Sequence, residues 1–129
     1  MTTLEKMTTD DRFANHVGVR LLEVSEGYAK AELAINSHHL NGLGIAHGGA
    51  IFTLADLVFA AASNSRGADA VAVNISISYF KAEREGVLTA EAKEISLNRK
   101  LATYFISVVN ESGEKIAAMQ GTAFRKTQR

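Results

Sequence analysis

The chain has 129 residues, enough for one domain with a substantial core but too few for a catalytic domain plus a separate binding domain. Its 14 Lys and Arg residues balance 14 Asp and Glu residues, so it lacks the net positive charge that favours nucleic acid or an anionic membrane. The absence of cysteine excludes disulfides, thiolate catalysis and Cys-ligated zinc, and is compatible with a reducing cytoplasm.

The chain is predicted to open with a short helix and a β-hairpin. The Asp10-Asp11 pair can cap a helix that runs over about 10–16. Two strands are predicted over 17–23 and 28–35, joined by a turn at Ser25-Glu26-Gly27. The first six residues have no basic start followed by an apolar block, so we expect no signal peptide and a cytoplasmic protein.

A nearly continuous apolar segment, residues 50–62, contains a single carboxylate, Asp56, in its middle. The Ala, Leu and Phe content, the glycine pair before the segment and the polar residues after it predict a central helix over about 48–63. Because this helix is apolar on nearly every side, we expect the fold to enclose it. It is shorter than the ~20 residues of a membrane span. An acid in such surroundings must find a partner or hold a raised pKa, which suits a group that handles protons.

Four strands are predicted after the central helix, in hairpin succession. Alternation predicts the first strand over 71–79, with an apolar face formed by Val71, Val73, Ile75, Ile77 and Tyr79. Three more strands are predicted over 87–96, 101–110 and 115–125, and residues 126–129 are expected to be loose. In the strand over 101–110, one face is formed by Tyr104, Ile106 and Val108.

Short turns suit antiparallel strands, so the whole pattern predicts a single α+β domain over 1–129. Its architecture would be a curved antiparallel sheet wrapped around one long helix. One helix covers only one face of such a sheet, while the other face and the edge strands remain to be covered. This favours an oligomer.

The start of the central helix has the properties of an anion-binding site. The first amides of a helix have no intrahelical partner and carry partial positive charge, and Gly48 and Gly49 have no side chains to block approach. A carbonyl oxygen that gains negative charge during acyl transfer suits this position. Asp56 could then activate water or attack the carbonyl itself, so the two features together indicate an ester or thioester hydrolase.

The spacing along the helix constrains how these two features meet. Gly49 and Asp56 are seven residues apart, which at 1.5 Å per residue is roughly 10.5 Å along the axis. A second, antiparallel copy would place Asp56 of one subunit opposite the Gly48-Gly49 end of the other. The sequence therefore predicts a homodimer with shared active sites.

The motifs around this helix resemble those of the hotdog-fold thioesterases, in particular the PaaI-like branch linked to phenylacetic acid degradation. The resemblance is close over 38–80 and rests on Asn41-x-x-Gly44-x-x-His47-Gly48-Gly49, Phe52-x-Leu54-Ala55-Asp56 and Asn64-Ser65. It implies that Asp56 is the catalytic carboxylate and that the Gly48 amide polarises the thioester carbonyl. It also implies that Asn41 and His47 position water, carbonyl and loop.

The same resemblance implies an acyl-CoA substrate, and a dimer that often pairs into a tetramer. An aryl-acyl group such as hydroxyphenylacetyl is our first expectation, with no cofactor beyond the coenzyme A of the substrate. Five residues are expected to bind this substrate: Gly49, Asn74, Ser76, Lys81 and Arg84. Lys81 and Arg84 could meet the phosphates of coenzyme A, although exposed bases near turns are commonly only solvated.

Structural roles remain open for several of these residues. Gly48 and Gly49 could simply permit a tight turn, and Asn41 could be a turn residue that tolerates left-handed geometry. For His47 we favour a bracing role, in which a ring nitrogen donates to a backbone carbonyl, over proton transfer. Asp56 could be a buried acid satisfied by a backbone N–H or a neighbouring Asn.

Other functions are also open. His38 and His39 invite a metal site with His47 and Asp56, but adjacent histidines do not form a recognised ligand spacing, so no metal is expected. A hotdog enoyl-CoA hydratase or dehydratase is one alternative to the thioesterase. A non-catalytic acyl-CoA binding or sensor module is another.

Overall fold

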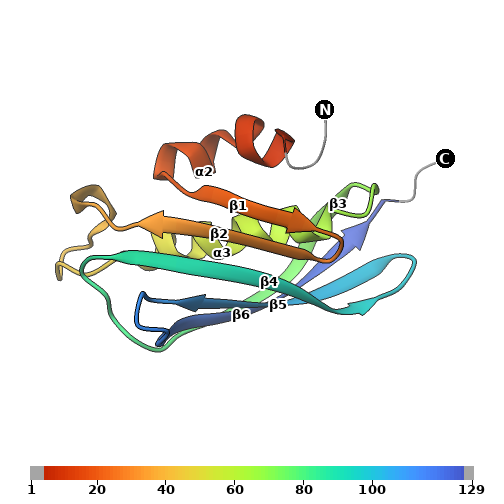
Figure 1. The fold of residues 1–129 in the computed structure, drawn as a ribbon. Helices are drawn as coiled ribbons and strands as arrows, with labels where there is room; N and C mark the ends of the chain where they lie inside the picture. The colour runs from red at the N-terminus through yellow and green to blue at the C-terminus, as the bar shows by residue number, and fades with distance from the viewer. Residues whose placement is uncertain (1–4, 127–129) are drawn as a thin grey trace.

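Six antiparallel strands curl around one long helix in the computed structural model, which describes residues 5–126 (Figure 1). The α+β architecture predicted from the sequence is confirmed. In chain order the elements are η1 (Lys6–Asp10), α2 (Arg12–Val17), β1 (Arg20–Ser25), β2 (Tyr28–Ala34), η2 (Ser37–His39), α3 (Gly48–Ser63), β3 (Ala70–Tyr79), β4 (Val87–Leu97), β5 (Leu101–Val109) and β6 (Lys115–Arg125). The predicted loose tail lies, except for Lys126, outside the described residues, as do the first four residues.

The N-terminal helix and hairpin form close to where they were predicted. The Asp11 carboxylate accepts a hydrogen bond from the Ala14 N–H at 3.0 Å, which caps α2. Gly18, with φ of 99°, ends the helix in the left-handed region. The first strand was predicted to begin at Val17 but begins at Arg20, because Val17 is the last residue of α2.

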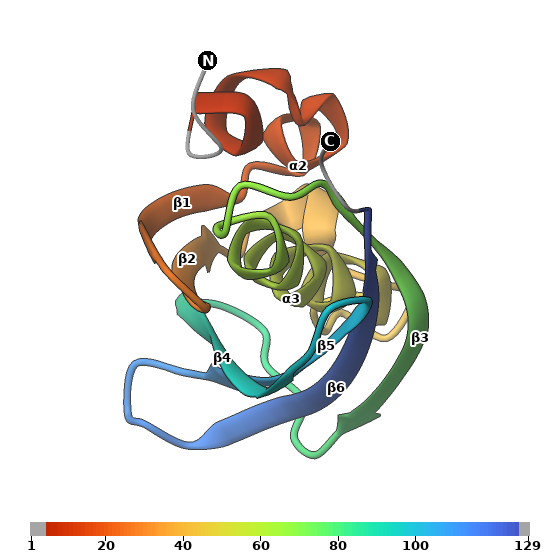
Figure 2. The same cartoon turned by 90° about the vertical axis from the view of Figure 1, so that its right-hand side faces the viewer.

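The central helix α3 has the bounds predicted for it and lies in the concave face of the sheet (Figure 2). Most of its side chains are buried, but Phe52, Asp56 and Ala60 are only half-buried. These residues are spaced four apart and so form one stripe along the helix. The expectation that the fold encloses α3 on every side is therefore wrong along this stripe.

The strand order is β1-β2-β4-β5-β6-β3, so β3 pairs with β6 and not with its neighbour in sequence. The predicted hairpin between β3 and β4 is therefore wrong. The place beside β4 is taken by β2, as in the pairing of Leu33 with Leu88. After α3 the chain enters the sheet at the edge opposite β1, where Figure 2 shows β3 as the outermost strand.

The regular alternation predicted for β3 is interrupted. The register against β6 shifts between Ala72 and Asn74, so Val73 is an extra residue in the strand. Ile75 and Ile77 pack against the core, whereas Val71 and Val73 are 48% and 57% exposed. The predicted apolar face is therefore correct only for the second half of the strand.

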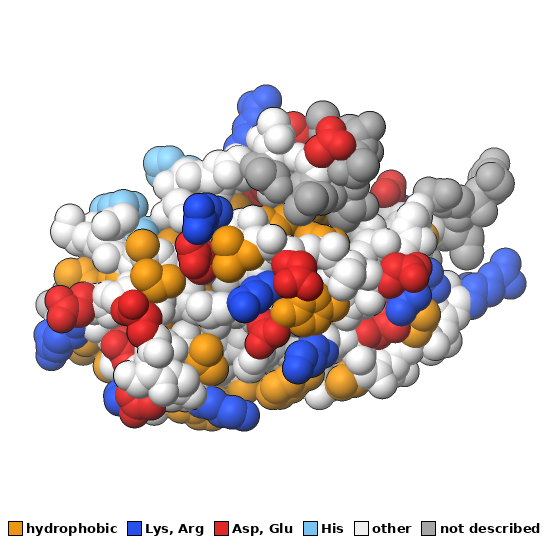
Figure 3. All heavy atoms as spheres, in the orientation of Figure 1, with side chains coloured by type: hydrophobic (Ala, Val, Ile, Leu, Met, Phe, Trp, Pro, Cys, Tyr) orange, Lys and Arg blue, Asp and Glu red, His pale blue; other side chains and the backbone are white. Residues whose placement is uncertain are grey.

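The core lies between α3 and the concave face of the sheet. Tyr104, Ile106 and Val108 of β5 are fully buried there, as their shared face predicted. Phe59 of α3 meets the Tyr104 ring edge-on, with centroids 5.9 Å apart. On the outer face over β1, β2 and β4, acidic and basic side chains are interspersed with apolar ones (Figure 3). No helix of the described residues combines the length and apolarity that a bilayer crossing requires.

Gly121 of β6 packs closely against Phe59 of α3, so a substitution there tests how tightly the sheet and the helix are packed. A Cβ added at Gly121 would lie 2.9 Å from Cε1 of the buried Phe59 ring, so either the ring or the strand would have to move. We expect Gly121→Ala to lower the free energy of unfolding by about 1–3 kcal/mol, measured by urea denaturation. Gly42→Ala is the control, because a Cβ there has no atom within 4 Å. Equal stability of the two variants would contradict this account.

Candidate active site

The loop before α3 is a tight turn built around Asn41. Its side-chain Oδ1 accepts hydrogen bonds from the N–H groups of Leu43 and Ile45 at 2.9 and 3.3 Å. The Asn41 N–H donates to the Ile45 carbonyl at 2.8 Å, and Gly44, with φ of 76°, closes the turn. The turn role considered for Asn41 is therefore observed, and it leaves the side-chain amide nitrogen without an acceptor among the described residues.

His47 caps the N-terminus of α3. Its ring Nδ1 accepts a hydrogen bond from the Gly49 N–H at 2.8 Å. The expected bracing role is present, but with reversed polarity, because the ring accepts from an amide instead of donating to a carbonyl. This bond also engages the Gly49 amide, which is then not available to a ligand.

Gly48 presents the unpaired amide of this helix end. Among the described residues, none accepts a hydrogen bond from the Gly48 N–H. Its carbonyl accepts from the Tyr79 hydroxyl at 3.1 Å, and the Tyr79 ring lies 3.4 Å from where a Gly48 Cβ would be. Tyr79 thereby holds the first turn of α3 against the end of β3.

A hollow of about 300 Å³, which we call the Gly48 hollow, opens beside this amide. Its walls are formed by Asn41, Ile45, Ala46, Gly48, Ile51, Tyr79, Phe80, Lys81 and Ala82. Three residues predicted from the sequence, Asn41, Gly48 and Lys81, therefore share one hollow. Lys81 is exposed and its Nζ pairs with Glu114 at 2.6 Å, while Arg84 donates to the Gly44 carbonyl at 3.4 Å.

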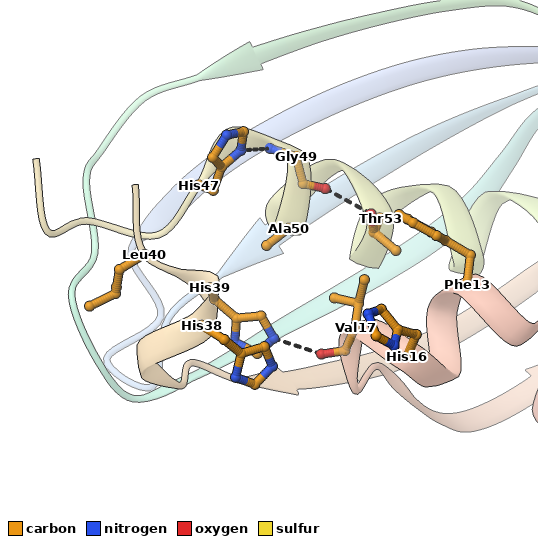
Figure 4. A pocket seen from close by; sticks show the side chains of 10 residues that line it. All are labelled: Phe13, His16, Val17, His38, His39, Leu40, His47, Gly49, Ala50 and Thr53. Atoms are coloured by element: carbon orange, nitrogen blue, oxygen red, sulfur yellow. Dashed lines mark hydrogen bonds between the residues drawn. The ribbon is translucent and has the colours of Figure 1, made fainter. Parts of the chain in front are cut away.

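A second hollow, of about 280 Å³, lies on the other side of the helix end, between α2, η2 and α3 (Figure 4). We call it the histidine hollow, because all four histidines of the chain line it. The rest of its lining is largely apolar, and the complete set is Phe13, His16, Val17, His38, His39, Leu40, His47, Gly49, Ala50 and Thr53. The N-terminus of α3 thus separates two hollows of similar size.

Asp56 lies two turns further along α3, in the half-buried stripe. Burial raises the pKa of its carboxyl group, and the negative charge of Asp11 on α2 raises it further. None of the described residues of this chain donates a hydrogen bond to this carboxylate. Asp56 and the Gly48 amide are not brought together within one subunit.

Two predicted substrate-binding residues lie away from the helix end. Asn74 and Ser76 pair with Thr122 and Gln120 of β6. Because Ile75 points into the core, alternation turns its neighbours Asn74 and Ser76 to the outer face of the sheet. Within one subunit they have no route to Gly48.

The four-residue metal hypothesis does not fit the geometry of His39. Both of its ring nitrogens are engaged, Nδ1 with the Asn36 N–H at 2.9 Å and Nε2 with the Val17 carbonyl at 2.6 Å. Across residues 5–126, no three His, Asp or Glu side chains converge in a way that could hold a metal ion.

Two residues that shape this site, Tyr79 and Asp11, have no site role in the prediction from the sequence. Tyr79 was included only as part of an apolar strand face, and Asp11 only as a helix cap. The hydroxyl group of a tyrosine commonly forms a hydrogen bond, and this property could have indicated a role for Tyr79 at the end of its strand. The proximity of Asp11 to Asp56 depends on tertiary packing of α2 on α3 and had no local signal.

The fold and the helix end define the class of protein: a hotdog enzyme, with one central helix held in a curled antiparallel sheet. The model of the thioesterase superfamily matches residues 43–117, and the chain therefore belongs to this superfamily and is a thioester hydrolase. An esterase-family protein of Archaeoglobus fulgidus is 48% identical over 120 residues, covering 92% of this chain and 78% of the relative.

Characterised relatives and solved structures agree with this assignment. The acyl-coenzyme A thioesterase PaaI of Escherichia coli is 32% identical over 92% of this chain and 86% of its own length. Its structure superposes with a TM-score of 0.93, covering 97% of this chain and 91% of PaaI. A hypothetical thioesterase of Streptococcus pneumoniae, solved with coenzyme A, has 26% identity and a TM-score of 0.87 over 98% of both chains.

The pair of Asp11 and Asp56 predicts a charge effect on the candidate catalytic acid. In Asp11→Asn we expect the pKa of Asp56 to fall while staying above its ordinary value, because burial, the larger cause, remains. Asn also caps helices well, so α2 should persist. The measurement is a ¹³C NMR titration of the Asp56 carboxyl, with the exposed Asp10→Asn as control. An unchanged Asp56 titration in Asp11→Asn would contradict the prediction.

Proposed function

We propose that this protein hydrolyses acyl-coenzyme A thioesters, and that each active site is shared between the two subunits of a homodimer. The observation that carries the proposal is the unpaired Gly48 N–H at the positive end of α3, in a hollow lined also by Asn41 and Lys81. An amide in this position can bind the carbonyl oxygen of a thioester as negative charge develops on it. Asp56 supplies the carboxylate that such a reaction needs.

The second subunit is required by distance. Asp56 lies eight residues after Gly48, the start of its own helix, which is roughly 12 Å along the axis and beyond the reach of its side chain. An antiparallel copy brings Asp56 of the partner subunit to the Gly48 hollow. The edge strand β3, with Val71 and Val73 exposed beside its unpaired backbone, is the surface that we assign to this pairing.

In the proposed reaction the thioester oxygen accepts a hydrogen bond from the Gly48 N–H. Asp56 of the partner subunit takes a proton from water while the water oxygen bonds to the carbonyl carbon. The C–S bond then breaks, and coenzyme A leaves as a thiol after taking up the proton. Alternatively, the Asp56 carboxylate attacks the carbonyl carbon itself and the C–S bond breaks, so that coenzyme A leaves as a thiolate that takes up a proton from water, and water then hydrolyses the anhydride that has formed. The raised pKa of Asp56 is compatible with both routes.

The two hollows beside the helix end suit the two halves of the substrate. We assign coenzyme A to the Gly48 hollow, whose rim carries Lys81, with Arg84 nearby for the phosphates. We assign the acyl group to the histidine hollow, whose largely apolar lining includes Phe13 and Val17. An aryl-acyl group such as hydroxyphenylacetyl is the proposed substrate, supported by the similarity to E. coli PaaI from the phenylacetic acid degradation operon.

Further assembly and location complete the proposal. Apolar side chains on the strands, including Phe105 and Phe124, are more than a third exposed, and favour a pairing of dimers into a tetramer. We place the enzyme in the cytoplasm, because a chain without cysteine forms no disulfides and so does not depend on an oxidising compartment. The reaction as written uses no cofactor beyond the coenzyme A of the substrate.

A panel of aromatic and aliphatic acyl-CoA thioesters tests the function through release of free thiol. We expect turnover by the wild type, fastest with an aryl-acyl group, and a loss of about 10²- to 10⁴-fold in kcat in Asp56→Asn with coenzyme A binding retained. Binding without thiol release in the wild type would establish a sensor instead. Hydration of an enoyl-CoA without thiol release would establish a hydratase.

Mixed dimers test the sharing of the site. Gly48 is the first residue of α3, where proline fits a helix, and His47 already has φ of −62° and ψ of 136°, which a following proline favours. Gly48→Pro therefore removes the N–H with little strain and should lower kcat about 10²- to 10³-fold, whereas the control Gly48→Ala adds a side chain but keeps the N–H and should lose less activity. Mixing Gly48→Pro with Asp56→Ala should restore activity, since each mixed dimer contains one intact site. No recovery despite subunit exchange, followed by mass spectrometry, would contradict the shared site.

A further inference from the structure

His39 is a buried titratable residue that the proposed reaction does not use. Its side chain is only 4% exposed, and the other buried polar side chains of the described residues are Thr53 and Ser63. Burying an imidazole requires that its nitrogens be satisfied, since an unpaired buried polar group is costly. The partners of His39 therefore show what it holds together.

The hydrogen bonds of the ring define a single tautomer. The Val17 carbonyl, 2.6 Å from Nε2, can only accept, so Nε2 carries the proton. Nδ1 accepts from the Asn36 N–H at 2.9 Å and therefore carries none. The imidazole is neutral and fully occupied in this arrangement, and Figure 4 shows it turned toward Val17.

The two ring bonds differ in reach. The bond to Asn36 is local, since it closes the cap of the short helix η2. The bond to the Val17 carbonyl spans 22 residues and satisfies a carbonyl that the end of α2 leaves without an intrahelical partner. His39 thus ties α2 to the loop that precedes α3.

The backbone of His39 continues this connection to the candidate active site. Its carbonyl accepts from the His47 N–H at 2.7 Å. The adjacent residues, Leu40 and Ala46, form an isolated antiparallel β-bridge. His47 in turn caps α3 through Gly49. A displacement of His39 is therefore transmitted directly to the residue that precedes the Gly48 amide.

The element at the other end of the link also belongs to the site. α2 carries Asp11, the charge that contributes to the raised pKa of Asp56, and its residues Phe13 and Val17 line the histidine hollow. His39 thereby connects the loop that presents the Gly48 amide with α2, which lines the histidine hollow beside that amide and, through Asp11, also lies beside the Asp56 that this subunit supplies to the other site of the proposed dimer.

We propose that His39 is a positioning residue for thioester hydrolysis. Through the Nε2–H bond to Val17 it fixes α2 against the loop that places the Gly48 amide. This inference rests on the proposed function. It predicts that loss of the long-range bond lowers kcat, because misplacement of a catalytic group by about 1 Å costs up to roughly 10²-fold in rate.

Two conservative variants separate the long-range bond from the local one. His39→Gln can place an amide N–H near the position of Nε2 and so keep the bond to Val17. His39→Asn can place an acceptor near the position of Nδ1 and keep only the bond to Asn36. We expect kcat to be about 10- to 100-fold lower in His39→Asn than in His39→Gln, with similar KM in the two variants. Circular dichroism and urea denaturation establish that each variant is folded under the assay conditions.

Equal kcat values in the two folded variants, or a selective loss in His39→Gln, would overturn the proposal. Long-range ¹H–¹⁵N NMR of the wild type provides a test that does not depend on turnover. The expected result is the Nε2–H tautomer, with the Gly48 amide signal displaced in His39→Asn and retained in His39→Gln. An Nδ1–H tautomer, or an undisturbed Gly48 signal in His39→Asn, would contradict the link even if the chain proved to have a different activity.

Discussion

The arrangement at the start of α3 depends on one constraint, which is that a single backbone amide stays unpaired while the groups around it are bonded. Within residues 5–126 nothing accepts from the Gly48 N–H, while His47 accepts from the Gly49 N–H and Asn41 folds the preceding loop onto itself. Tyr79 fastens the first turn from the sheet side. The positive end of the helix is thus held rigidly, which is the condition under which an amide stabilises developing charge without reorganising.

The second constraint is the length of the helix. Asp56 is held in a half-buried environment that raises the pKa of its carboxyl group, yet it is two turns away from the amide. In the proposed enzyme these two features meet only across a subunit boundary. The open stripe on α3 and the uncovered edge of β3 are then parts of the catalytic design, since the surfaces that one subunit leaves bare are the ones its copy needs.

Much of this structure could be predicted from the sequence, because its strongest signals are local. The glycine pair that opens α3 and the polar residues after it predicted a helix over about 48–63, close to the observed one, and alternation located the strands. The position of β3 beside β6 could not be predicted, since alternation does not encode which strand is the neighbour. The bulge at Val73 could not be predicted either. One extra residue leaves the alternation in the sequence unchanged, although it changes which face of the sheet the residues before it occupy.

Candidate site residues followed the same division. Gly48 and Asp56 were identifiable from motif and composition, whereas the polarity of the His47 bond and the burial of His39 depend on ring orientation and tertiary packing.

The bare edge of β3 has a further consequence for how the protein behaves in solution. A row of unpaired backbone groups is a template for any extended chain, and Val73 adds an apolar contact beside it. For an obligate pair, folding free energy and subunit concentration are inseparable by mass action. In the proposed homodimer, dilution would therefore separate the subunits and lower the stability of each.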